Sequence, residues 1–279
     1  MKTGLESLVM EAKENKKMKN SDALNKKGGY FLQSAKRKLH MYLLAVTMIN
    51  AEAAISQVTV ASQETIPLLV RKCPDFDLTG KGDNNEWART EWNDLTKLDS
   101  GGKAYASKFK IMYSEKGIYV LFYGEDDKIS TRFDKDFGDL FKGDVFEVFF
   151  HTDPKTLLYL EYEINQLNKE LVLLVPNVNG KAYGWIPWHY EKNRSINKTV
   201  EVSGGKKEAN GAVTSWHAEL FFPYDLFRPL GNVPPNSGTT WNANFYRLDY
   251  DTGKMIKWAW GPVQNSFHEL EKFRPVKFE

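Results

Sequence analysis

The chain has 279 residues, of which 42% are hydrophobic and 27% are charged. These values exclude a collagen-like, a wholly disordered or a polytopic membrane protein, and the length favours one folded core. From Ala54 onward the chain carries 28 basic and 31 acidic side chains, so it offers no broad cationic field to nucleic acid. The single cysteine, Cys73, excludes an internal disulfide and a zinc site of several thiolates.

The first 53 residues contain the three parts of a secretion signal behind a long polar leader. Three basic residues, Lys36 to Lys38, precede a hydrophobic region over 41–50 that is too short to span a bilayer. Small residues follow at alternate positions, so cleavage is expected after Ala53. The sequence therefore predicts a secreted or periplasmic protein in which residues 54–279 form one domain, with no membrane contact once the leader is removed.

The rest of the chain contains many short strand patterns and little helix. Leu68 to Val70 could form an early strand, and the polar stretch from Leu78 to Trp92 is predicted to be a loop anchored by its two tryptophans. Tyr224 to Phe227 is the one short helical candidate. Runs rich in aromatic and β-branched residues predict strands at 109–113, 118–123, 145–150, 159–164, 171–175, 199–202, 213–222, 241–250 and 255–260. This pattern favours an all-β, antiparallel two-sheet β-sandwich.

Alternation along the predicted strands indicates which side chains share a face. In the strand from Tyr159 to Ile164, every second residue from Leu160 onward is apolar and is expected to point into the core. Tyr159, Glu161 and Glu163 then lie together on the opposite face. A ligand could bind on that second face.

Sequence motifs of common catalytic sites are missing from the chain, and its five histidines are scattered. Glu147, Glu161 and Glu163 could in principle supply the acid and nucleophile of a glycosidase, but that pair needs a defined carboxyl separation. Asp134, Asp136 and Asp139 surround a turn and could hold a structural calcium ion, because calcium prefers oxygen ligands. A solvated loop is the favoured interpretation of these aspartates, and no other cofactor is expected.

Four stretches in the same order resemble family 9 carbohydrate-binding modules. The likeness covers about residues 75–279, and its motifs are moderately specific as an ordered set. The four stretches are Tyr113 to Tyr123 with the acidic residues after it, Phe141 to Phe150, Trp216 to Pro223, and Gln264 to Phe273.

The resemblance implies a jelly-roll or immunoglobulin-like β-sandwich that binds sugar without catalysing a reaction. Family members commonly act alongside glycoside hydrolases in the breakdown of plant polysaccharides such as xylan, so the expected partners are an oligosaccharide or polysaccharide and a hydrolase. The family holds the end of a glycan between two aromatic rings. Pyranose rings present C–H groups to an aromatic face, whereas their hydroxyls need carboxylate and amide partners.

Transferred by motif, the two rings of the family fall on Phe141 and Phe267. Glu147 and Gln264 or Asn265 are then the expected hydrogen-bonding partners, and His268 follows the second ring. The chain departs from the family at three positions. Phenylalanine replaces tryptophan at both ring positions, and Glu163 stands where the family has an arginine.

Another candidate binding surface is the loop from Ala182 to Tyr190, which carries four aromatic rings. Trp185 and Trp188 either offer a stacking surface to a sugar or plug the end of the core, and the sequence leaves both interpretations open. Trp258 and Trp260 are two residues apart on one strand face, where core packing is the favoured explanation.

Two functions of other classes remain as alternatives. One is a glycoside hydrolase that uses Glu147 or Glu163. The other is a haem b-binding sandwich for extracellular electron transfer, since related sandwiches bind haem through side chains of the kind found at Met112, Met255 and His268.

Overall fold

The computed structural model describes residues 66–279, and within this range the regular secondary structure consists of β-strands and short 3-10 helices. The strands are β1 (Leu68–Lys72), β2 (Asn93–Asp94), β3 (Thr96–Lys97), β4 (Ser107–Tyr113), β5 (Gly117–Glu125), β6 (Val145–His151), β7 (Leu158–Ile164), β8 (Glu170–Val178), β9 (Lys181–Ala182), β10 (Ile186–Pro187), β11 (Asn197–Ser203), β12 (Ser215–Pro223), β13 (Thr240–Asp249), β14 (Ile256–Ala259) and β15 (Arg274–Phe278). Five short 3-10 helices join them: η1 (Asn85–Arg89), η2 (Leu140–Lys142), η3 (Lys192–Arg194), η4 (Tyr224–Phe227) and η5 (Leu270–Lys272).

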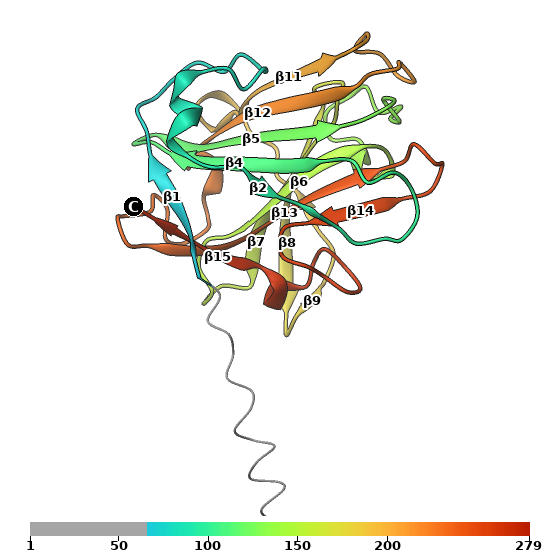
Figure 1. The fold of residues 1–279 in the computed structure, drawn as a ribbon. Helices are drawn as coiled ribbons and strands as arrows, with labels where there is room; N and C mark the ends of the chain where they lie inside the picture. Colours follow the sequence, from blue (N-terminus) through green and yellow to red (C-terminus); the bar gives the residue numbers. More distant parts are fainter. Residues whose placement is uncertain (1–65) are drawn as a thin grey trace, which may run out of the picture. The chain divides into compact units, whose positions relative to one another are not determined.

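The main strands form one hydrogen-bonded path in the order β10-β8-β7-β6-β13-β15-β1-β4-β5-β12-β11 (Figure 1). Strand β1 runs parallel to both of its neighbours, β15 and β4, whereas every other described pair is antiparallel. The prediction of an all-β chain with few short helices is confirmed. The prediction of purely antiparallel pairing is wrong at β1, which pairs with β15 through Leu68–Val70 and with β4 through Arg71–Lys72.

The main core lies between the two halves of this path. Phe109 on β4 stacks on Phe245 of β13 with 3.6 Å between ring centroids, and Phe122 on β5 stacks on Phe146 of β6 at 4.7 Å. Trp258 and Trp260 belong to the same buried cluster, as predicted. Burial of so many rings accounts for much of the aromatic content, because each buried aromatic side chain removes a large apolar area from water.

The predicted alternation along β7 is confirmed and defines two faces. Leu160, Tyr162 and Ile164 lie in the main core, whereas Tyr159 belongs to a second apolar cluster on the other side of the strand. Strands β6, β8 and β13 alternate in the same way. Four adjacent strands therefore present a second face, and the candidate site lies on it.

The polar stretch from Leu78 to Trp92 is anchored by its two tryptophans, as the sequence predicts. Trp87 in η1 is buried and donates its indole N–H to the Glu219 carboxylate at 2.6 Å, and Trp92 packs beside it. Cys73 is a free, buried thiol in the same cluster. The predicted leader, the hydrophobic region 41–50 and the cleavage position after Ala53 lie outside the described residues. From residue 66 onward, no helix has the length and apolar character needed to cross a membrane.

Candidate functional site

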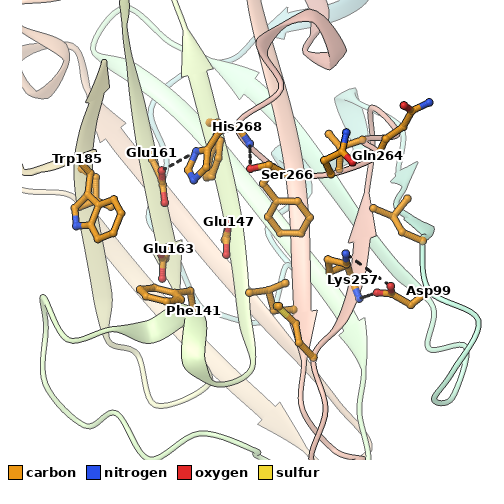
Figure 2. A pocket seen from close by; sticks show the side chains of 18 residues that line it. Asp99, Phe141, Glu147, Glu161, Glu163, Trp185, Lys257, Gln264, Ser266 and His268 are labelled. Carbon is orange, nitrogen blue, oxygen red and sulfur yellow. Dashed lines mark hydrogen bonds and ion pairs between the residues drawn. The ribbon is translucent and has the colours of Figure 1, made fainter. Parts of the chain in front are cut away.

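A pocket of about 430 Å³ lies on the second face, over β6, β7 and β13 (Figure 2). Its volume is within the range of small-ligand sites. Eight of the nine residues predicted to bind carbohydrate line it: Phe141, Glu147, Glu163, Trp185, Gln264, Asn265, Phe267 and His268. Residues from four separate stretches of sequence therefore meet at one cavity, although their contact with a sugar stays a prediction.

Three glutamates form the floor of the pocket, and we call Glu147, Glu161 and Glu163 the acid floor. Glu147 on β6 lies directly opposite Glu163 on β7, and Glu161 precedes Glu163 by two residues on the same face. Their exposed fractions are 3%, 5% and 1%. Side chains directly opposite on paired strands lie about 5 Å apart at Cβ, so like charges there repel one another.

The acid floor lacks a basic partner among the described residues. None of the ion pairs in residues 66–279 joins a lysine or arginine to it. The Oε2 atoms of Glu161 and Glu163 are buried without a hydrogen-bond partner. Burial raises the pKa of Glu161 to about 8, and burial together with the neighbouring carboxyls raises the pKa of Glu147 and of Glu163 well above the ordinary range. The surroundings therefore favour the neutral form of these three carboxyls.

His268 lies at one end of the acid floor and is held in place by its neighbours. Its Nδ1 is 2.5 Å from the Tyr159 hydroxyl and 3.7 Å from Glu161 Oε2, and its backbone carbonyl accepts a hydrogen bond from the Asn177 amide at 3.0 Å. Burial lowers the pKa of His268. The imidazole is therefore neutral near pH 7 and does not supply the missing positive charge.

Aromatic rings form the walls, and they differ in how freely they can receive a ligand. Trp185 is 60% exposed and faces the acid floor from one side, with Phe141 beside Glu163 (Figure 2). Phe267 stacks on Tyr246 with 4.0 Å between centroids, so one face of this ring is already covered. Tyrosine hydroxyls fix both phenylalanine segments, since Tyr250 donates to the Phe141 carbonyl at 2.8 Å and Tyr246 donates to the Phe267 carbonyl at 2.7 Å.

The polar rim is set by the loop before η5. The Glu269 carboxylate accepts the backbone N–H groups of Gln264, Asn265 and Ser266 at 3.1, 2.5 and 3.0 Å, which fixes the loop and leaves the Gln264 and Asn265 side chains exposed. On the far side of the pocket Lys257 pairs with Asp99 at 3.7 Å. Its charge is therefore already matched by a carboxylate.

Trp188 is the predicted site residue that does not line the pocket. Its indole N–H donates to the Leu226 carbonyl at 2.9 Å, and its ring packs against the main core. Of the two interpretations left open for this loop, Trp185 faces the cavity and Trp188 contributes to packing. Ile186 lies between the two tryptophans in the sequence and pairs with Leu174 of β8. This pairing fixes the loop against the sheet, with Trp185 on one side of β10 and Trp188 on the other.

Other predicted groups fall outside the pocket. Met112 is buried in the cluster around Trp87, away from Met255 and His268, which both line the cavity. In the turn considered for calcium, Asp136 pairs with Lys198 at 2.8 Å and Asp139 with Lys142 at 2.5 Å. Calcium binding at this turn stays a prediction.

Sequence reasoning missed several lining residues. The strand pattern predicts Glu161 on the ligand face but gives it no role in sugar binding, although the alternation of β7 sets it beside Glu163. Asp99, Lys257 and Met255 also line the cavity, and of these only Met255 is named from the sequence, as a candidate haem ligand. No local signal in the sequence brings these three to the site, because β3 and β14 reach it only through their pairing with each other and with β13.

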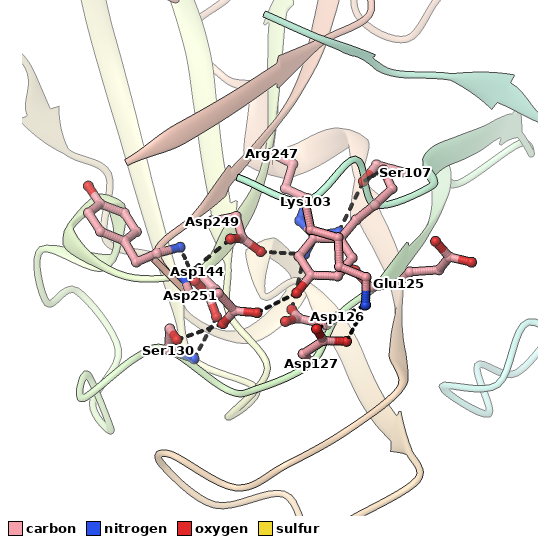
Figure 3. A network of polar contacts seen from close by, with 12 residues as sticks. Lys103, Ser107, Glu125, Asp126, Asp127, Ser130, Asp144, Arg247, Asp249 and Asp251 are labelled. Atoms are coloured by element: carbon pink, nitrogen blue, oxygen red, sulfur yellow. Dashed lines mark hydrogen bonds and ion pairs between the residues drawn. The ribbon is translucent and has the colours of Figure 1, made fainter. Parts of the chain in front are cut away.

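A second group of buried acids surrounds Arg247 (Figure 3). The guanidinium donates to Asp126 at 3.1 Å and to Asp249 at 2.7 Å, and one oxygen from each of these residues and from Asp251 lie within 4.8 Å of one another. Burial and the nearby carboxylates raise the pKa of Asp126 to about 7, against the opposing effect of Arg247. Arg247 therefore supplies positive charge to two of these three carboxyl groups.

Comparison with known proteins points to one family. The family model described as carbohydrate-binding family 9 matches residues 86–278. A candidate carbohydrate-binding protein from Bacteroides uniformis ATCC 8492 has a similar structure, with a TM-score of 0.62 and 16% identity over 76% of this chain and 99% of that one.

Two structures of a family 9 carbohydrate-binding module from Caldicellulosiruptor kristjanssonii are also similar. The complex with glucose gives a TM-score of 0.54 at 14% identity over 76% of this chain and 95% of that one. The complex with cellotriose gives 0.54 at 15% identity over 76% and 93%. At these identities the similarity concerns the fold. A search of curated proteins found no match.

Proposed function

The chain belongs to carbohydrate-binding family 9 and is a non-catalytic carbohydrate-binding module, and from this we propose that the pocket over the acid floor receives one end of an oligosaccharide. The observation that carries the proposal is the meeting of Trp185, Phe141 and Phe267 around one cavity. Aromatic faces pack against the C–H faces of a pyranose, and the exposed amides at the rim can bind its hydroxyls.

We propose that the site binds the end of a chain rather than its middle, as the family resemblance implies. A terminal sugar can enter between Trp185 and the loop that carries Gln264. We propose a plant-type oligosaccharide end as the general ligand class, as the family resemblance implies, and a glycoside hydrolase as the partner that acts on the same polysaccharide.

The acid floor argues against the glycosidase alternative. A retaining glycosidase needs one carboxylate that is ionised to act as nucleophile and one protonated acid. Burial raises the pKa of all three glutamates, and no lysine or arginine of the described residues pairs with them to keep one ionised. For the haem alternative, only Met255 and His268 share a cavity, and Met112 is buried elsewhere.

Titration calorimetry with cellotriose and xylotriose tests the proposed function. Trp185→Ala should weaken binding about tenfold, since an aromatic platform contributes about 1 kcal/mol beyond its buried area. Tyr183→Ala is a matched control, because Tyr183 is 61% exposed in the same loop and does not line the pocket. Equal binding by wild type and Trp185→Ala would contradict the proposed site.

Two further proposals concern the fold and the location of the protein. We propose that the strand path is a jelly-roll-like sandwich, because rings from β4 and β5 pack against rings from β13 and β6. We also propose export with cleavage after Ala53, which the cationic, apolar and small-residue segments support. N-terminal sequencing of secreted protein should find Ala54 first, and an intact Met1 would contradict export by this signal.

A further inference from the structure

The acid floor differs from the other buried acids of the described chain. The Glu219 carboxylate accepts the Trp87 indole N–H and a backbone N–H from Thr79, each at 2.6 Å. Glu269 accepts three backbone N–H groups, and the aspartates around Arg247 share its guanidinium. Buried carboxyls normally have such partners, because an unpaired buried polar group costs free energy. In the acid floor, Oε2 of Glu161 and Oε2 of Glu163 have none.

Glu161 and Glu163 both line an open cavity, although these two oxygens are themselves covered. Lys257 is the basic residue among those lining the cavity, and it is paired with Asp99 on the opposite side (Figure 2). The donors and the positive charge that the acid floor lacks can therefore come from a ligand. An ammonium group supplies one charge and several N–H donors, which can pair with two neighbouring carboxyl groups.

A bare metal ion fits the acid floor less well than an organic cation. In residues 66–279, the acidic group whose oxygens approach within 4.8 Å of one another is Asp126, Asp249 and Asp251, and the acid floor does not meet this spacing. The exposed face of Trp185 beside it suits a sugar ring. The ligand therefore combines a pyranose ring with an ammonium group.

We propose that the pocket selects a saccharide end that carries a free amino group, an amino sugar of the glucosamine type, over the neutral sugar of the same shape. This inference rests on the proposed function and narrows its ligand class. The amine enters over Glu147, Glu161 and Glu163, and the sugar ring packs on Trp185. A neutral sugar places a hydroxyl there, which brings no charge to stabilise the ionised form of these carboxyls.

The test compares three disaccharides by titration calorimetry at pH 7. They are β-1,4-linked diglucosamine, cellobiose, which carries hydroxyls in place of the amines, and N,N′-diacetylchitobiose, in which the amines are blocked. Diglucosamine should bind at least about tenfold more tightly than either of the others, because hydrogen bonds with an ionised donor or acceptor are roughly twice as strong as neutral ones. The blocked ligand tests the charge without altering the protein.

Two variants assign the effect to the acid floor. Glu161→Gln and Glu163→Gln should each reduce the preference for diglucosamine over cellobiose by about tenfold. Glu208→Gln is the matched control, since Glu208 is exposed in the loop between β11 and β12 and does not line the pocket. Cellobiose binding as tightly as diglucosamine would overturn this inference and leave the proposed function intact. If none of the three disaccharides nor cellotriose binds, the proposed function falls as well.

Discussion

Replacing Glu161 by glutamine should stabilise the folded protein near neutral pH. Burial raises the pKa of Glu161 to about 8 from its ordinary value of 4.5. Between these values the unfolded chain has released the proton and the folded protein still holds it, so the stability of the wild type falls as pH rises. One such proton lowers the free energy of unfolding by about 1.4 kcal/mol per pH unit. This contribution is fully present below pH 4.5 and is lost by about pH 8.

Glutamine keeps the shape of the side chain but does not titrate. At pH 5 the two proteins should therefore be similar in stability, and by pH 7 the Glu161→Gln variant should be the more stable by about 3 kcal/mol. Urea unfolding at pH 5, 6 and 7 measures this difference, with Glu208→Gln as the exposed control. A constant difference between variant and wild type over this range, or a less stable variant at pH 7, would refute the assignment of a buried, uncompensated carboxyl at Glu161.

Three further substitutions test the packing and the polar network by chemical denaturation. Trp87→Phe removes the indole donor to the buried Glu219 carboxylate and should lower the free energy of unfolding by about 1–3 kcal/mol; no loss would show that this contact is not needed. Arg247→Met leaves buried aspartates without their cation and should cost about 3–5 kcal/mol at pH 7, whereas a stable variant would contradict the network in Figure 3. Trp188→Ala removes the hydrogen bond to the Leu226 carbonyl and should lower the free energy of unfolding by about 1–3 kcal/mol. Cellotriose affinity should stay unchanged, and weaker binding would show that Trp188 contributes to the site.

Most of the fold could be predicted from local sequence patterns. All nine predicted strands are present, and the helical candidate at Tyr224–Phe227 forms η4 with the predicted bounds. Period-two alternation succeeds where one face of a strand packs on the core, as in β7. The parallel pairing of β1 could not be predicted in this way, because it depends on contact between Leu68–Val70 and Val276–Phe278 at the opposite end of the chain.

The candidate site was predictable to the extent that a family motif marked its residues. Phe141, Glu147 and Phe267 are far apart in sequence and line one cavity. The chemical character of the site was not predictable, because the missing partners of Glu161 and Glu163 are a property of the folded surroundings rather than of any motif. Likewise, the sequence alone does not distinguish the roles of the two tryptophans. Trp185 is exposed at the pocket, whereas the indole N–H of Trp188 donates to the Leu226 carbonyl.

A crystal structure of the protein with bound cellotriose tests the proposed site most directly. We expect a terminal sugar ring against Trp185 and Phe141, with its hydroxyls directed at the acid floor and the rim amide of Gln264. Cellotriose bound elsewhere on residues 66–279, with the pocket over Glu147, Glu161 and Glu163 empty, would contradict it.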